Sequence, residues 1–115
     1  MPLDCIFCAI AAGEIPSQLV YETEHVVAFA DLNGQAPTHL LIIPRRHYAS
    51  LQDVPAEEIG IVGELMQAAQ ELARERRIWP NGYRLVINAG PNGGQTVQHL
   101  HVHFLAGRQM VWPPG

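Results

Sequence analysis

The sequence has no long apolar run, no excess of positive charge and only two cysteines, and each absence excludes a class of protein. No stretch of the 115 residues approaches the length of a membrane-spanning helix. The seven basic residues are outnumbered by eleven acidic ones, which gives a formal net charge of -4. That balance argues against a broad basic surface for a nucleic-acid polymer, although it still allows a small local anion site.

The N-terminal segment MPLDCIFCAIAAGEI has no basic region followed by a long apolar stretch, so it is a poor signal peptide. We therefore expect a cytoplasmic protein, in which Cys5 and Cys8 are thiols or metal ligands rather than a structural disulfide. The chain also lacks internal repeats and low-complexity tracts. Its length and its 48% hydrophobic content predict one globular domain over residues 1–115.

Hydrophobic patterning predicts two helices and five strands. The apolar segment 5–13 ends in glycine, which is typical of a short helix. A long helix is expected over 53–77, with Asp53 as its cap and Pro55 in its first turn. Its buried face is expected to comprise Ile59, Val62, Leu65, Met66, Ala69 and Leu72. The expected strands are 19–21, 26–29, 39–44, 84–90 and 99–107.

The order of these elements favours an α+β fold with a mainly antiparallel sheet, because the strands cluster and the helices do not alternate with them. Five strands in so short a chain leave an edge or a face of the sheet exposed. A second copy of the chain would be an ordinary way to cover it.

Three histidines, His99, His101 and His103, occupy alternate positions in the segment HLHVHFLAG. Because side chains alternate faces along a strand, the three should share one face, opposite Leu100, Val102 and Phe104. Such a row suits either zinc ligation or attack by a neutral imidazole on an electrophile. A polar strand face without function is the simpler alternative, and the strict alternation favours a site over it.

The segment NAGPNGGQT, just before the histidines, is rich in glycine and ends in Thr96. Glycines let main-chain N–H groups approach an anion closely, and Thr96 adds a hydroxyl. Taken alone, the segment is typical of a tight turn. Beside three histidines, it indicates a phosphate cradle that serves a nucleophile.

These residues are recognisable together, since GGQTVQHLHVHFLAGR resembles the signature of the histidine triad (HIT) family. The segments CIFCAIAAGEIPS, VVAFADLNGQAPTHLLIIPRRH, GYRLVINAG and GRQMVWPPG are similar to the nucleotide-binding, purine nucleoside phosphoramidase branch of that family. The similarity covers nearly the whole chain and is weakest in the long helix. It implies a HIT-like fold, with about five antiparallel strands, one short helix, one long helix and a homodimer whose sheets join into one.

The resemblance also implies an activity, the hydrolysis of the P–N bond in purine nucleoside 5′-phosphoramidates such as adenosine 5′-monophosphoramidate. His101 would form a covalent nucleotidyl-histidine, and its other ring nitrogen would donate to the main-chain carbonyl of His99. His103 and Thr96 would act beside the phosphate and the leaving group. That mechanism requires no metal. The implied partners are purine nucleoside monophosphates, their phosphoramidates and a second copy of the chain, with no nucleic-acid polymer and no membrane.

The remaining roles come from the resemblance alone. The residues expected to bind substrate are Ile15, Phe29 and Leu32 around the base, Asp31 at the ribose, Asn88 and Gly94 beside the phosphate, His39 behind the triad, and Trp112 at the partner's site. Position 96 is threonine where we expect serine, and position 111 is valine where animal members carry histidine. Both differences bear on leaving-group range and specificity.

Cys5 and Cys8 form half of a zinc site, and some bacterial members of the family look as if they complete it with residues matching His47 and His99. Two buried apolar thiols on a short helix are the alternative.

Three other functions of the protein remain open. They are a nucleotide-binding or scaffolding module with weak catalysis, a hydrolase of dinucleoside polyphosphates, and a zinc hydrolase with the three histidines as ligands.

Overall fold

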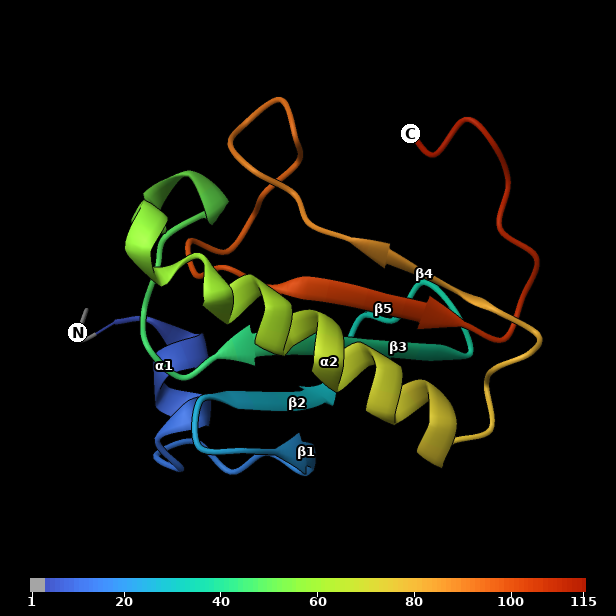
Figure 1. Ribbon diagram of the computed structural model, residues 1–115, viewed down its shortest axis with the longest axis horizontal. Helices are drawn as coiled ribbons and strands as arrows, with labels where there is room; N and C mark the ends of the chain where they lie inside the picture. Colours follow the sequence, from blue (N-terminus) through green and yellow to red (C-terminus); the bar gives the residue numbers. More distant parts are fainter. Residues whose placement is uncertain (1–3) are drawn as a thin grey trace.

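The computed structural model describes residues 4–115, in which a five-stranded antiparallel sheet carries a helix on each face (Figure 1). The elements in chain order are α1 (Ile6–Ala11), β1 (Leu19–Glu22), β2 (Val26–Ala30), β3 (Thr38–Pro44), α2 (Gly60–Glu75), β4 (Tyr83–Val86) and β5 (Val102–Ala106). The strand order in space is β1-β2-β3-β5-β4, and every neighbouring pair is antiparallel. The predicted α+β class and sheet are confirmed. The expected domain also includes residues 1–3, which lie outside the described residues.

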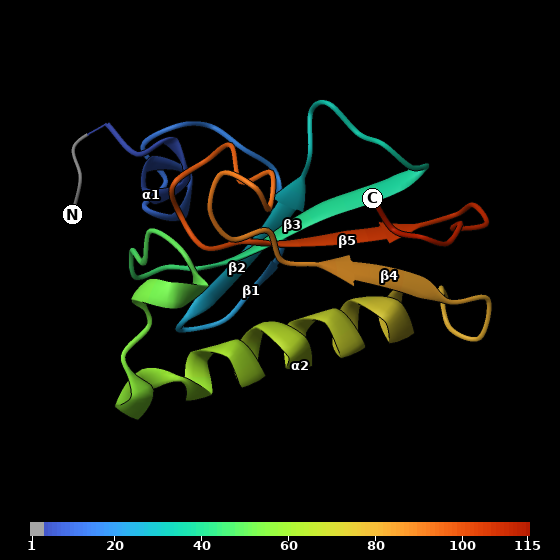
Figure 2. The same cartoon turned by 90° about the horizontal axis from the view of Figure 1, so that it is seen from above.

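The long helix α2 runs along one face of the sheet (Figure 2). Between them lies the larger apolar core, to which α2 contributes Leu65, Ala68, Ala69, Leu72 and Ala73. The alternate residues Leu100, Val102 and Phe104 point into this core, as the sequence predicted. Burying a side chain of leucine or phenylalanine size stabilises the fold by about 1.5–3 kcal/mol. This face therefore contributes much of the stability.

The short helix α1 lies on the opposite face, near the carboxyl end of β3 and the start of β5 (Figures 1 and 2). Its residues Phe7, Ile10 and Ala11 pack in a second, smaller apolar cluster with Val27, Phe29, Leu41 and Ile43 of the sheet. Cys5 caps the helix, since its sulfur accepts the main-chain N–H of Cys8 at 3.3 Å. Gly13 follows with a φ of 77°, which confirms the predicted glycine stop.

The long helix is shorter than predicted, because it begins at Gly60 rather than at Asp53. Two 3-10 turns, Leu51–Asp53 and Ala56–Glu58, precede it. Pro55 is the physical reason: a residue before proline is driven to extended backbone, and Val54 has a φ of -79° and a ψ of 118°. Asp53 accordingly does not cap α2. Ile59, expected in the buried face, is 51% exposed.

The last two strands are also shorter than predicted, since β4 ends at Val86 and β5 begins only at Val102. His99 and His101 therefore precede the regular strand. The main-chain N–H of Leu100 donates to the Tyr48 carbonyl at 2.7 Å, which takes this segment out of the sheet ladder. No helix in the described part of the chain is long and apolar enough to span a membrane.

Candidate functional site

The main-chain carbonyl of His99 fixes the tautomer of the His101 ring. Its Nδ1 lies 2.7 Å from the main-chain oxygen of His99. A carbonyl oxygen can only accept, so Nδ1 carries a proton, and the uncharged ring has its lone pair on Nε2. The side chain is 4% exposed, and the Phe7 ring meets it edge-on at 5.3 Å between centroids. His101 is thus a fixed imidazole with one basic, nucleophilic nitrogen.

His103 lies on β5 and His39 on the neighbouring β3. A hydrogen bond of 2.9 Å joins His103 Nδ1 to His39 Nε2. The main-chain N–H of Gln35 donates to His39 Nδ1 at 2.9 Å. His39 Nδ1 is therefore an acceptor, and its Nε2–H donates to His103 Nδ1. The proton of neutral His103 must then be on Nε2. Gln35, His39 and His103 form a hydrogen-bonded chain that ends in an N–H donor beside His101, whose ring centroid is 4.9 Å from that of His103.

Burial keeps these rings uncharged. Desolvation lowers the pKa of His103 to about 4, and the neighbouring imidazoles of His101 and His39 act in the same direction. Burial also lowers the pKa of His39, against the attraction of Asp31, whose Oδ2 is 3.4 Å from His39 Nε2. Both rings are neutral near pH 7, so the chain of hydrogen bonds presents a fixed N–H donor at His103 Nε2.

Asp31, His39 and His103 also bring three candidate ligand atoms within 4.8 Å of one another. The hydrogen bond from Gln35 argues against a metal there. Ligation through His39 Nε2 would move the proton to Nδ1, where it would face the Gln35 N–H at 2.9 Å, donor against donor. This cluster is better suited to holding the His103 N–H as a hydrogen-bond donor.

The loop before the histidines is shaped by glycine and by a buried glutamine. A Cβ on Gly93 would lie 2.4 Å from the Ala89 oxygen, and Gly94 has a φ of 81°. The side chain of Gln95 accepts from the Gly90 N–H at 3.0 Å and donates to the carbonyls of Ala49 and Val97 at 2.7 and 3.0 Å. The predicted turn is therefore a loop held by the buried Gln95 side chain, and Thr96 is exposed on it.

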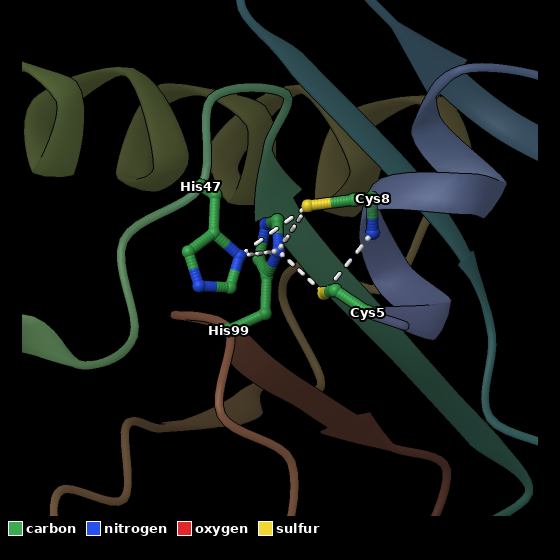
Figure 3. Close-up of side chains that lie close together, drawn as sticks. All are labelled: Cys5, Cys8, His47 and His99. Carbon is green, nitrogen blue, oxygen red and sulfur yellow. Dashed lines mark hydrogen bonds between the residues drawn. The ribbon is translucent and has the colours of Figure 1, made fainter. Parts of the chain in front are cut away.

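A second cluster lies where α1 meets the loop after β3. Cys5, Cys8, His47 and His99 converge there (Figure 3), and their ligand atoms all lie within 4.8 Å of one another. His99 Nδ1 is 3.4 Å from Cys5 Sγ, 3.5 Å from Cys8 Sγ and 3.2 Å from His47 Nδ1. Cys8 Sγ is 3.3 Å from His47 Nδ1. The four residues that the sequence suggested for zinc are thus brought together.

These separations fit one tetrahedral zinc ion. Ordinary Zn–S and Zn–N bond lengths at tetrahedral angles give S···N edges of about 3.5 Å and N···N edges of about 3.3 Å. His99 Nε2 lies 2.9 Å from the Pro44 carbonyl and donates to it, which leaves Nδ1 unprotonated toward the cluster. Burial lowers the pKa of His99 to about 4, despite that hydrogen bond, so the ring is neutral as a ligand must be. Cys2His2 donors of this kind are typical of a structural zinc site.

The substrate-binding residues taken from the resemblance divide into two groups. Asp31 and His39 lie beside His103, while Phe29 is buried against Phe7, with ring centroids 5.4 Å apart. Leu32 and Trp112 are exposed to 103% and 82%, so these two do not pack into a single copy of the chain, while Ile15 is 39% exposed. Asn88 is partly buried and Gly94 is exposed.

Sequence reasoning missed Phe7, the Gln35 N–H and the Pro44 carbonyl as parts of the site. The last two are main-chain groups, for which side-chain identity gives no signal. Phe7 lies between the two cysteines, where its position in CIFC could have suggested a role.

Comparison with known proteins agrees with this geometry. Residues 12–110 match the model of the HIT domain. A 14 kDa zinc-binding protein of Zea mays is 52% identical over 112 residues, which are 96% of this chain and 87% of that protein. The solved structure of a HIT family hydrolase from Legionella pneumophila is 47% identical, with a TM-score of 0.94, over 97% of this chain and all of that one (100%).

A histidine triad nucleotide-binding protein from Candida albicans has the same fold at 31% identity, with a TM-score of 0.81, over 96% of this chain and 83% of that one. A small antiparallel α+β domain with a histidine-lined site is thus the class that the fold defines. Within that class, the chain belongs to the HIT family.

Proposed function

We propose that this protein hydrolyses the P–N bond of purine nucleoside 5′-phosphoramidates, with His101 as the nucleophile. The observation that carries the proposal is the 2.7 Å bond from His101 Nδ1 to the His99 carbonyl, because it directs the lone pair of Nε2 to the reacting side. The hydrolase and nucleotide-binding relatives support the same reading.

In the first step, His101 Nε2 bonds to phosphorus, and the P–N bond breaks. The departing nitrogen takes a proton from solvent while the Nε2–H of His103 donates a hydrogen bond to it, and the Nε2–H of His39 holds His103 in that tautomer. In the second step, water cleaves the nucleotidyl-histidine and releases the nucleoside monophosphate. Main-chain N–H groups of the glycine loop, with Thr96 and Asn88, would neutralise charge on the phosphate.

The other substrate contacts are proposed on the resemblance. Asp31 would accept the ribose hydroxyls. Ile15, Phe29 and Leu32 would enclose the purine. Trp112 of a second copy would complete the pocket, in a homodimer whose sheets join. This follows the purine nucleoside phosphoramidase branch of the family.

We also propose that Cys5, Cys8, His47 and His99 hold a structural zinc ion. The four donor separations and the zinc-binding relative from maize support it. All four positions of such an ion would be filled by protein, so it would supply stability rather than a site for water. Reduced thiols favour a reducing compartment, which supports the expected cytoplasmic location.

The test is hydrolysis of adenosine 5′-monophosphoramidate by the wild type and by His101→Ala, each with and without a chelator. We expect activity in the wild type, no measurable activity in the variant, and no immediate loss on adding chelator. His25→Ala is the matched control, because His25 is an exposed histidine on the β1–β2 turn that pairs with Glu64. Diadenosine tetraphosphate, assayed in parallel, tests the main alternative substrate.

Equal activity in His101→Ala and wild type would refute the proposed nucleophile. Binding of adenosine monophosphate without any turnover would favour the nucleotide-binding module. The zinc hydrolase with three histidine ligands is disfavoured by the geometry, since the ring of His99 faces the cysteines and that of His103 faces His39.

A further inference from the structure

We propose that Cys5 and Cys8 are a redox modification site whose oxidation to a disulfide releases the zinc and slows the reaction at His101. The proposal rests on the zinc site and the nucleophile proposed above. It goes beyond them because it links the two sites and assigns the cysteines a regulated chemical change.

The two sites share residues. His99 points its ring into the Cys5–Cys8–His47 cluster, while its main-chain oxygen fixes the tautomer of His101 at 2.7 Å. Phe7, which stands between the two cysteines in the sequence, packs edge-on against both rings, with centroids 5.9 Å from His99 and 5.3 Å from His101. A change in the zinc ligands therefore acts on His101 in two ways, through the main chain of His99 and through the ring of Phe7.

The helix α1 is held on the sheet mainly by its apolar contacts. It is six residues long, far below the length at which a helix is stable alone in water. Besides its apolar contacts, it is tied by Arg45, whose guanidinium donates to the Ala11 carbonyl at 3.1 Å. Zinc would tie its first turn to His47 and His99. Loss of the ion would loosen that turn, and Phe7 with it.

The cysteines are placed for a disulfide. Residues Ile6 and Phe7 between them begin α1, so helix geometry sets the two Cα atoms about 5 Å apart. Disulfides span about 4.4–6.8 Å between Cα atoms. A cavity of about 370 Å³ opens beside the cluster, lined by Cys5 and His47 on one side and by Thr96, Val97 and Gln98 on another. Cys5 is only half-buried, so a small oxidant can reach its sulfur.

The proposed oxidant is a peroxide. The thiolate of Cys5 attacks one peroxide oxygen and becomes a sulfenic acid, and with hydrogen peroxide the other oxygen leaves as water after protonation. The Cys8 sulfur then attacks that sulfenic acid, and a second water leaves. Two thiolates have lost two electrons, hydrogen peroxide has gained two, and two protons have been consumed. The disulfide no longer offers thiolate ligands, so only the imidazoles of His47 and His99 remain and the zinc ion departs.

The experiment treats zinc-loaded full-length protein with hydrogen peroxide equimolar to the chain. A colorimetric chelator measures released zinc, and peptide mass spectrometry detects a Cys5–Cys8 link. The downfield NMR signal of the His101 Nδ1 proton reports its hydrogen bond to His99. We expect about one zinc released per disulfide formed, a shifted or broadened His101 signal, and a loss of about tenfold in kcat/KM, as for other groups that orient active-site ligands. Dithiothreitol with zinc should restore all of these.

Cys5→His is the control, because it keeps four zinc donors but leaves a single thiol. It should retain zinc at the same peroxide dose, and Cys5→Asp serves the same purpose if the histidine does not fit. The proposal is overturned if the reduced protein holds no zinc, if zinc stays bound while both cysteines remain alkylatable after peroxide, or if the disulfide forms with kcat/KM and the His101 signal unchanged. An inactive but otherwise zinc-loaded wild type would refute the hydrolase, while zinc release, the disulfide and the NMR signal would still decide the redox proposal.

Discussion

For single residues, the chemistry of this site depends on which ring nitrogen carries a proton. Main-chain groups decide it in three cases: the His99 carbonyl for His101, the Gln35 N–H for His39 and the Pro44 carbonyl for His99. Backbone donors and acceptors cannot change their protonation, so the tautomers are set by the fold.

Removal of the His39 ring should affect the departure of the amine more than the attack of His101. His39→Ala leaves His103 Nδ1 without its donor, so the proton on His103 Nε2 is no longer enforced. We expect kcat to fall about 100-fold for a basic alkylamine leaving group, at the lower end of general acid catalysis. An arylamine, which leaves with less help, should lose less. Steady-state kinetics with the two amides measures this. An equal loss for both amides would contradict this role of His39.

Acid should destabilise the fold through His103 as the pH falls below 6.5. The pKa of His103 is about 4 in the folded chain, against an ordinary value of 6.5. As the pH falls from 6.5 toward 4, the unfolded chain takes up a proton at this site that the folded chain does not, so the free energy of unfolding decreases. Urea unfolding at several pH values measures this. His103→Asn should show a smaller decrease over that window, and an equal one would contradict the assignment.

The sequence predicted which histidines share one face, but not how the surrounding main chain holds them. The alternation of His99, His101 and His103 correctly predicted a polar set opposite Leu100, Val102 and Phe104. The alternation could not predict that only His103 lies in the regular strand. That depends on a main-chain hydrogen bond between Leu100 and Tyr48, which are distant in the chain. Long-range main-chain bonds leave no pattern in the sequence.

Among the elements, α1 and its N-cap carry two of the four residues proposed to bind zinc, Cys8 and Cys5, and zinc binding should release protons. Burial raises the pKa of the Cys8 thiol to about 11, with a further contribution from Cys5, so Cys8 is protonated in the metal-free chain at neutral pH. His99 is already neutral and contributes none. We expect at least about one proton per zinc, and an affinity that increases with pH. Titration of zinc into weakly buffered apoprotein, with a pH indicator, measures it. Absence of proton release would exclude ligation by Cys8.

The helix α2 should affect stability and leave the chemistry alone. Its residue Leu65 is fully buried between the helix and the sheet, on the face away from the histidines. Leu65→Ala should lower the free energy of unfolding by about 2–5 kcal/mol, through lost burial and a residual cavity. Below its melting temperature the variant should keep its kcat. Thermal unfolding and kinetics, run on the same sample, check this. A large loss of kcat in fully folded protein would show coupling through the sheet.

Element boundaries were predicted well where one local signal dominated. Gly13 ended α1 as expected, and β2 and β3 followed their apolar runs. The start of α2 was wrong because Asp53 and Pro55 both resemble helix-start residues. The constraint of Pro55 on Val54 outweighed them.

For the whole molecule, β4 is an edge strand of the sheet, and its unpaired side remains to be covered. We expect sedimentation equilibrium to give roughly twice the 12.7 kDa mass of the chain, as a two-fold homodimer requires. Removal of residues 112–115 should leave that mass unchanged and reduce activity, if Trp112 acts at the partner's site. A monomer would contradict the expected homodimer. Full activity of the shortened chain would contradict the role of Trp112.

The two faces of the sheet differ in what they tolerate. The resemblance to the family is weakest in the long helix, which covers the face that carries none of the histidine chemistry. The outward side of α2 is therefore where a fluorophore, an affinity tag or a tether to a surface can be attached. A probe there would leave the histidine rings untouched. The same label on Cys5 or Cys8 would block residues that we propose bind zinc.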